Sequence, residues 1–106
     1  MQRINRPSGN GNGEFYIEKI LDKELGQKCS LYAKVIVPPK ASVGYHEHHG
    51  DSESYYILEG EGVYDDNGEK RAVKAGDSTW TPDGFGHSIE NTGDKDLVFM
   101  ALIINS

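Results

Sequence analysis

Turn-forming residues interrupt this sequence about every ten residues, and this spacing leaves little room for long helices. Between the turns lie short runs rich in β-branched and aromatic residues, which favour strands. The clearest runs are 31–37, 43–48, 53–58, 69–74, 78–81, 87–91 and 97–104. The dipeptide Asn67-Gly68 predicts a tight hairpin turn, because both residues tolerate positive φ. We therefore expect an all-β chain that folds as a small antiparallel sandwich or barrel.

The chain has 106 residues, enough for one domain. Residues 1–13 end in GNGNG and have almost no apolar content, so we interpret them as a flexible N-terminal tail. Residues 14–106 are then the single folded domain. The segment 14–25 fits both a helical stripe and a strand, and the β-type runs that follow favour the strand.

Charge and cysteine content exclude several classes of protein. The formal net charge of −6 argues against nucleic-acid binding and against a polybasic membrane anchor. No apolar run approaches the roughly 18 residues that a membrane-spanning helix needs. The single cysteine, Cys29, excludes an intrachain disulfide and a multi-cysteine zinc site. We expect a cytoplasmic protein with neither nucleic acid nor membrane among its partners.

Three of the four histidines lie within four residues of one another. His46 and His48 are two apart, so on a strand they face the same side, whereas His49 faces away. Glu53 and the distant His87 could join them in a set of three imidazoles and one carboxylate, which suits a divalent transition metal. A His-x-His pair on a strand is more often a surface pair, so the metal interpretation depends on the joint spacing.

That spacing carries a family resemblance. The segment 46–60 (HEHHGDSESYYILEG) resembles the first motif of the cupin superfamily, and 76–91 (GDSTWTPDGFGHSIEN) resembles the second. The short segment 61–75 between them is typical of small single-domain bacterial members. The matching motif positions are His46, His48, Glu53, Gly60, Gly76, Pro82, Gly84, His87 and Asn91.

The resemblance implies a small jelly-roll β-barrel with one divalent metal inside it. It implies His46, His48, Glu53 and His87 as the ligands, with manganese, iron, nickel, zinc and copper all open as the metal. One position departs from the first motif: Lys40 stands where the family usually has glycine. We expect Pro38-Pro39 to make that turn instead.

Two aromatic residues are candidates for the ligand pocket. Strand alternation from Glu53 places Tyr55 on the inner face, where it either donates a hydrogen bond to a bound ligand or packs as ordinary core. Trp80 either forms a wall of the pocket or packs in the core. Lys34 is a weak candidate for a general base, with a solvated surface role as its alternative.

Cupins resemble one another in site and differ in chemistry, so the fold does not fix the reaction. The resemblance favours a small metalloenzyme of the dioxygenase, decarboxylase or isomerase type that acts on an oxygen-rich anionic small molecule. The alternative is a non-catalytic module that binds metal and a small ligand as a sensor or store. Small cupins are also expected to be homodimers, and residues 14–21 would then pack as a strand on the partner's sheet.

Overall fold

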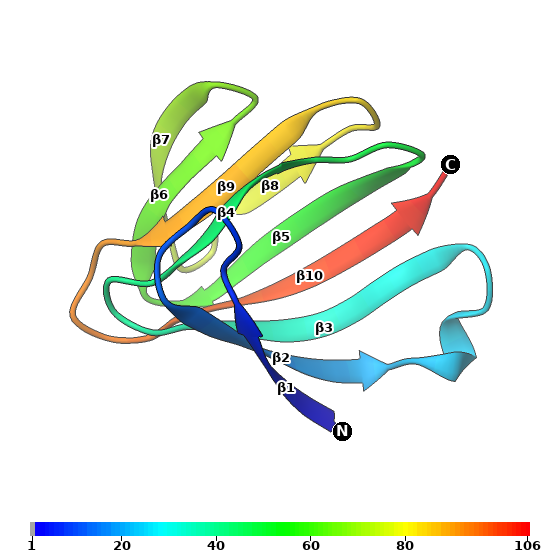
Figure 1. Cartoon of the computed structure of the whole chain (residues 1–106), viewed down its shortest axis with the longest axis horizontal. Helices are drawn as coiled ribbons and strands as arrows, with labels where there is room; N and C mark the ends of the chain where they lie inside the picture. Colours follow the sequence, from blue (N-terminus) through cyan, green and yellow to red (C-terminus); the bar gives the residue numbers. More distant parts are fainter. Residues whose placement is uncertain (1) are drawn as a thin grey trace.

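The computed structural model, which describes residues 2–106, is built from two antiparallel β-sheets that face each other (Figure 1). The larger sheet contains, in spatial order, β1 (Gln2–Pro7), β2 (Glu14–Leu21), β3 (Cys29–Val37), β10 (Leu97–Asn105), β5 (Asp51–Glu59) and β8 (Ser78–Thr81). The smaller sheet contains β4 (Ser42–Glu47), β9 (Gly86–Asn91), β6 (Glu61–Asp66) and β7 (Glu69–Lys74). A short 3₁₀ turn, η1 (Lys23–Leu25), joins β2 to β3. The all-β jelly-roll prediction is confirmed.

The hairpin between β6 and β7 forms where the sequence predicted it. Asn67 and Gly68 have positive φ values of 53° and 101°, and Asp66 pairs directly with Glu69. This conformation matches the right-handed twist of the flanking strands, which is why Asn-Gly is favoured there.

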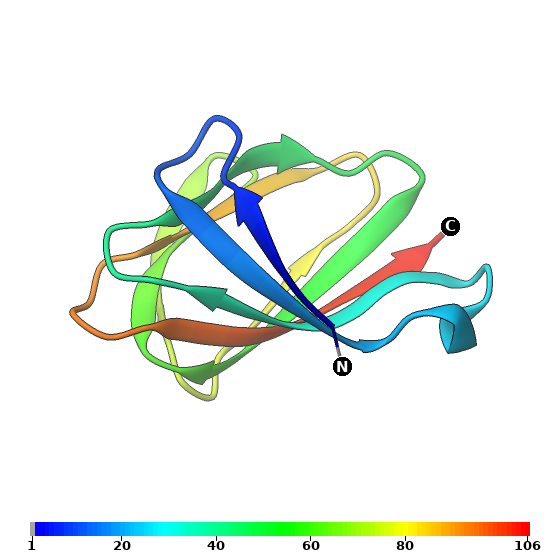
Figure 2. The same ribbon diagram turned by 60° about the horizontal axis from the view of Figure 1, so that its bottom comes forward.

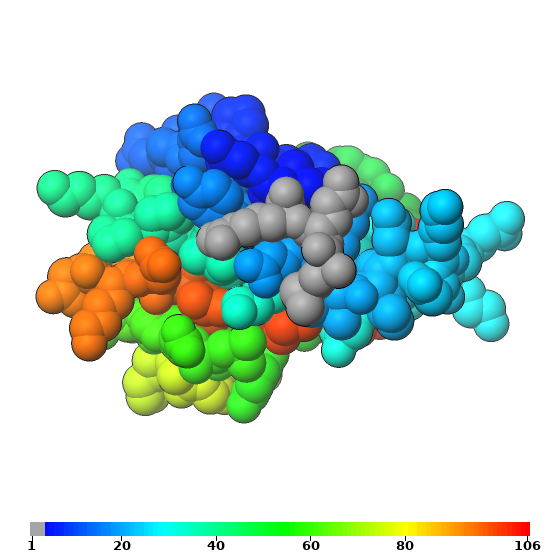
Figure 3. Space-filling view, turned by 90° about the horizontal axis from the view of Figure 1, so that it is seen from below, coloured from blue at the N-terminus to red at the C-terminus, as the bar shows by residue number. Residues whose placement is uncertain are grey.

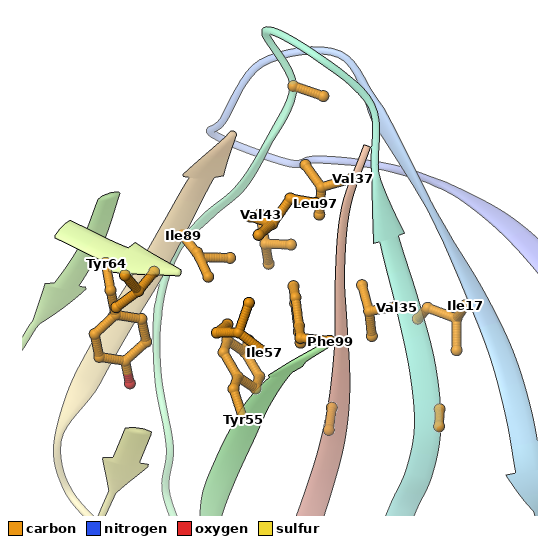
Figure 4. Packing of buried hydrophobic residues seen from close by; sticks show 14 residues of the cluster. Ile17, Val35, Val37, Val43, Tyr55, Ile57, Tyr64, Ile89, Leu97 and Phe99 are labelled. Carbon is orange, nitrogen blue, oxygen red and sulfur yellow. The ribbon is translucent and has the colours of Figure 1, made fainter. Parts of the chain in front are cut away.

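The hydrophobic core lies between the two sheets (Figure 4). Ile89 of the smaller sheet lies opposite Phe99 and Ile57 of the larger sheet, and all three are almost fully buried. Alternate residues of each strand supply these side chains, as the period of two requires. The core therefore fixes which face of each strand points inward, including the strands that carry polar inward residues.

The N-terminal segment contains a strand that the sequence interpretation did not anticipate. Gln2–Pro7 pairs with β2 from Gln2↔Lys19 to Pro7↔Glu14, as Figure 2 shows from a second direction. In the space-filling view of Figure 3, the blue residues of the N-terminal segment lie on the upper side of the molecule. Backbone pairing with β2 holds β1 in place. A strand held in this way does not need a pattern of apolar residues, so the sequence of this segment did not indicate a strand. The division into a tail of residues 1–13 and a barrel of 14–106 stays a prediction.

The strand expected at 14–21 is β2, but its neighbour differs from the expectation. It pairs with β3 of the same chain, with Ile17 beside Val35. Pro38-Pro39 takes part in the turn before β4, as expected: the Ala41 amide donates to the Pro38 carbonyl at 3.1 Å. Within this turn Lys40 has a φ of 68°, a conformation that favours glycine. Within residues 2–106, no helix is long and apolar enough to cross a membrane.

Candidate metal centre

Four side chains from both sheets converge on one point inside the barrel. His46 on β4 and His87 on β9 are cross-strand partners in the smaller sheet, whereas Glu53 projects from β5 of the larger sheet. His48 lies just after β4, where the chain crosses from one sheet to the other. One ligand atom of each residue lies within 4.8 Å of the other three, and only His46 is more than slightly exposed.

The distances among these atoms suit a metal ion. The Nε2 atom of His87 lies 3.0 Å from Nε2 of His48 and 3.1 Å from Nε2 of His46. Oε1 of Glu53 lies 3.0 Å from Nε2 of both His48 and His87. In an octahedral shell with bonds of about 2.1 Å, adjacent ligand atoms are about 3.0 Å apart. Four of the distances match adjacent positions of such a shell, whereas Oε1 of Glu53 lies farther, 3.9 Å, from Nε2 of His46. A six-coordinate divalent ion held by these four atoms would have two positions left for other ligands.

Hydrogen bonds on the far side of two rings turn their Nε2 lone pairs toward this point. Nδ1 of His46 lies 2.8 Å from the carbonyl oxygen of Gly44, and Nδ1 of His48 lies 2.8 Å from Oδ1 of Asp51. A carbonyl and a carboxylate can only accept, so Nδ1 carries the proton in both rings. When these rings are neutral, their two Nε2 atoms are unprotonated and face a carboxylate oxygen, an arrangement that a cation stabilises.

The third imidazole rests on two buried hydroxyl groups. Nδ1 of His87 lies 2.8 Å from the Tyr64 hydroxyl and 2.8 Å from Oγ1 of Thr81. These two hydroxyl groups also contact each other at 2.5 Å. His87, Tyr64 and Thr81 are fully buried, so packing from every side fixes the orientation of this ring.

The electrostatics of the cluster favour positive charge at its centre. Burial alone would raise the pKa of Glu53, but hydrogen bonding to the three imidazoles lowers it well below its usual range. Hydrogen bonding to Glu53 raises the pKa of His46 and of His48. Burial lowers the pKa of His87, so that ring remains neutral. The Glu53 carboxylate therefore stays ionised. Its negative charge stabilises either protonated imidazole rings beside it or a bound metal ion.

Backbone hydrogen bonds join the two loops that carry the ligands. The His48 amide donates to the Phe85 carbonyl at 2.9 Å, and the Gly84 amide donates to the His48 carbonyl at 2.7 Å. Gly84 has a φ of 88°, a conformation that favours glycine. The Gly50 amide donates to Oδ1 of Asp83 at 2.9 Å. The glycines and the aspartate of the two motifs therefore bring His48 and His87 together.

The structure brings one of the two predicted pocket aromatics to the site. Tyr55 is buried, and its ring stacks against that of His87 with centroids 4.9 Å apart. Burial raises the pKa of its hydroxyl group, which therefore stays protonated. Trp80 lies elsewhere: it is 52% exposed on the outer face of β8, because alternation turns Thr79 and Thr81 inward. The expectation that Trp80 forms a pocket wall or packs in the core is wrong.

Several residues that support the ligands were missed from the sequence. Asp51 holds His48, and Tyr64 and Thr81 hold His87. The inward position of Thr81 could have been inferred from the alternation of β8, but the contact of Tyr64 with His87 needed the three-dimensional pairing of β6 with β9. His49 is exposed and faces away, as its position out of phase predicted.

Comparison with known proteins agrees with the motifs. Residues 33–103 match the family model described as "Cupin domain". The chain is 49% identical over 104 residues to a Thermotoga maritima protein named "Oxalate-binding protein", covering 97% of this chain and 85% of that protein. A solved structure described as a "predicted oxalate decarboxylase" from Thermotoga maritima has a TM-score of 0.92 at 47% identity, covering 99% of this chain and 91% of that one.

More distant relatives bear on the fold. The chain is 43% identical over 72 residues to an uncharacterized protein of Methanocaldococcus jannaschii, which covers 68% of this chain and 57% of that protein. The cupin domain of Schizosaccharomyces pombe Cnp3 has a TM-score of 0.80 at 16% identity, covering 92% of this chain and 69% of that one. The second likeness extends to the fold alone.

Proposed function

Because this chain belongs to the cupin family, we propose that it holds one divalent transition metal and, on that metal, a small oxygen-rich anion. The proposed metal ligands are His46, His48, Glu53 and His87. The observation that carries the proposal is the convergence of their four ligand atoms, with Nδ1 of His46 and of His48 bonded to acceptors. The metal would act as a Lewis acid toward an oxygen ligand.

Charge explains why the anion would bind inside an acidic protein. A divalent ion together with the single carboxylate of Glu53 leaves a net charge of about +1 at the site. This charge is local, so the overall charge of −6 does not oppose a small anion that reaches the centre. The 49% identical relative named for oxalate binding supports oxalate as the first anion to test.

Turnover is the second candidate function. The relative described as a predicted oxalate decarboxylase favours a carboxylate reaction over hydrolysis. The titratable groups in contact with the cluster include Asp51, Tyr55 and Tyr64. Asp51 and Tyr64 are hydrogen-bonded to Nδ1 of His48 and of His87, and the raised pKa of Tyr55 makes its hydroxyl group a hydrogen-bond donor and a poor base. Binding without turnover is therefore the function that the site supports best.

The test measures metal and anion in sequence. The purified protein is stripped with a chelator, reloaded with Mn²⁺, and titrated with oxalate in a calorimeter. We expect one metal per chain and oxalate binding that requires it. In the same assays the His48→Ala variant should lose the metal. The His49→Ala variant, changed at the exposed neighbour, should still bind both the metal and oxalate. Metal retention by His48→Ala, or oxalate binding by the stripped protein, would contradict the proposal.

A product assay separates the two candidate functions. Decarboxylation of oxalate consumes a proton and yields formate and carbon dioxide. Formate detection after prolonged incubation of the Mn²⁺-loaded protein would establish the enzyme. Stoichiometric oxalate binding without formate would establish the binding module.

We also propose that the chain forms a homodimer. Three large apolar side chains are exposed on the outer face of β5 and β8, at one edge of the larger sheet: Tyr56, Leu58 and Trp80. Clustered apolar exposure of this kind is typical of contact surfaces. Light scattering during size-exclusion chromatography should give twice the 11.7 kDa chain mass, and a monomer mass would contradict the dimer.

A further inference from the structure

A cavity of about 530 Å³ opens directly beside the candidate metal centre. Three of the four candidate ligands, His46, His48 and Glu53, line one part of it. The ring of Tyr55, which stacks on His87, lies at the border of that part. A molecule held at the centre would therefore extend into this cavity.

One side of the rest of the cavity is an apolar wall, and Arg6, Ser8, Asn10 and Tyr45 line another part of it. Strands β2, β3 and β10 pair side by side, and their inward residues supply most of the apolar wall. Figure 4 shows Val35, Phe99 and Ile17 of this wall directed into the space between the sheets. We use the name apolar wall for one set of lining residues: Phe15, Ile17, Leu31, Val35, Phe99, Ala101 and Ile103.

Neighbours in the wall lie directly beside one another. Ile103 pairs with Leu31, and Phe99 pairs with Val35, across the β10–β3 ladder. Cross-strand partners on one face have Cβ atoms about 5 Å apart, so their side chains form a continuous surface. Ala101 lies between the two pairs on β10 and also lines the cavity. The wall is thus an uninterrupted apolar surface rather than scattered contacts.

An oxalate ion does not match this surface. It occupies the volume of a few water molecules, on the order of 100 Å³, and has no apolar part. With oxalate at the centre, water would have to cover the apolar wall, and wetting such a surface is unfavourable. A ligand with an apolar portion would displace that water and gain affinity.

We infer that the site is built for a carboxylate with an apolar body attached next to its metal-binding oxygens. This inference rests on the proposed function, because the metal centre would hold the oxygen-rich end. The apolar body lies against the wall formed by β2, β3 and β10. Oxalate then occupies only the polar end of a larger binding site.

The test uses a series of straight-chain 2-oxo acids as probes. Pyruvate, 2-oxobutanoate, 2-oxopentanoate and 2-oxohexanoate carry the same oxygen-rich end and differ by one CH₂ group at each step. Each probe is titrated into the Mn²⁺-loaded full chain by calorimetry, with oxalate as the reference. We expect the dissociation constant to fall about threefold to fourfold for each added CH₂ group, the effect of burying one such group.

Two negative results have different meanings. If oxalate binds but the dissociation constants of the 2-oxo acids stay level or rise with chain length, the apolar body is wrong and the metal centre stands. If neither oxalate nor any 2-oxo acid binds to the Mn²⁺-loaded protein, the proposed function fails together with this inference.

A matched pair of variants locates the effect on the wall. Ile103→Trp fills the cavity from β10, whereas Leu102→Trp puts the same side chain on the opposite face of the same strand. The gain in affinity per CH₂ group should disappear in Ile103→Trp and persist in Leu102→Trp. Equal behaviour of the two variants, once thermal melting shows both folded, would overturn the inference.

Discussion

The two sides of the cavity are built on opposite principles. On one side, each polar side chain has its own partner: Gly44 for His46, Asp51 for His48, and the Tyr64 and Thr81 hydroxyl groups for His87. On the other side, apolar residues of β2, β3 and β10 contact one another without directional bonds. The first side fixes the positions of a few atoms, whereas the second fixes only a shape.

This contrast has an energetic meaning. Burial of a carboxylate and three imidazoles does not favour folding unless their polar atoms are satisfied, and a metal ion would satisfy all four at once. The apolar wall stabilises the fold directly through the hydrophobic effect. Substitutions on the polar side should therefore change metal affinity, and substitutions on the apolar side should change stability.

The largest effect is expected for Glu53→Gln. The amide keeps the shape of the side chain but removes the negative charge, so the three imidazoles would face a cation without compensation. We expect Mn²⁺ affinity to fall at least about a hundredfold, beyond what loss of a supporting partner causes. Competition with a fluorescent chelator measures it, and an affinity within tenfold of the unmodified protein would exclude Glu53 as a ligand.

Phe99→Ala tests the opposite side. Phe99 is fully buried, and its removal should lower the free energy of unfolding by about 3–5 kcal/mol in urea titrations of the metal-free protein. Met100→Ala, the partly exposed neighbour on the outer face, is the control and should cost much less. Metal stoichiometry of the folded fraction should stay at one per chain. Loss of metal in the folded Phe99→Ala protein would remove the distinction between the two sides.

Asp51→Asn addresses a partner rather than a ligand. The carboxylate of Asp51 holds the proton on Nδ1 of His48, and an amide can present either an acceptor or a donor there. Loss of a supporting partner of this kind typically lowers metal affinity by about 10–100-fold. The chelator competition should show such a loss for Asp51→Asn and no loss for Asp94→Asn on the exposed surface.

A lower pH should weaken metal binding, which involves only the polar side of the cavity. Metal ligation needs neutral imidazoles, and hydrogen bonding to Glu53 raises the pKa of His46 and of His48 above the usual 6.5. As the pH falls through these raised pKa values, protons compete with the metal, and affinity should drop about tenfold to a hundredfold per pH unit. Affinity that rises or stays constant between pH 7.5 and 5.5 would contradict this sign.

The smallest effect is expected for Trp80→Ala. This side chain is 52% exposed and lies outside both sides of the cavity. The dissociation constants for Mn²⁺ and for oxalate should each change less than about twofold. A larger change, in a variant whose oligomeric state is unaltered, would show that Trp80 contributes to the binding pocket.

The same contrast explains what could be predicted from the sequence. The polar side depends on residue types that have few other uses inside a barrel, so His46, His48, Glu53 and His87 were singled out by spacing and by family resemblance. The inward direction of Tyr55 followed from strand alternation, which the core enforces. Strand positions were also predictable, because Gly and Asn-Gly turns mark their ends.

The apolar wall could not be predicted in this way. Leu31 and Ile103 are ordinary strand residues, and nothing in their sequence context separates a core contact from a cavity wall. That distinction depends on how far β2, β3 and β10 diverge from the smaller sheet. Strand β1 was missed for a related reason, because backbone hydrogen bonds to β2 hold it and its side chains give no periodic signal.

The central claim is that one metal ion lies among four defined atoms. Diffraction data collected at the manganese absorption edge, from crystals of the Mn²⁺-loaded protein, test it directly. We expect one anomalous peak per chain within bonding distance of Nε2 of His46, His48 and His87 and of an Oε atom of Glu53. A peak elsewhere, or none at this point in crystals that contain manganese, would contradict the account.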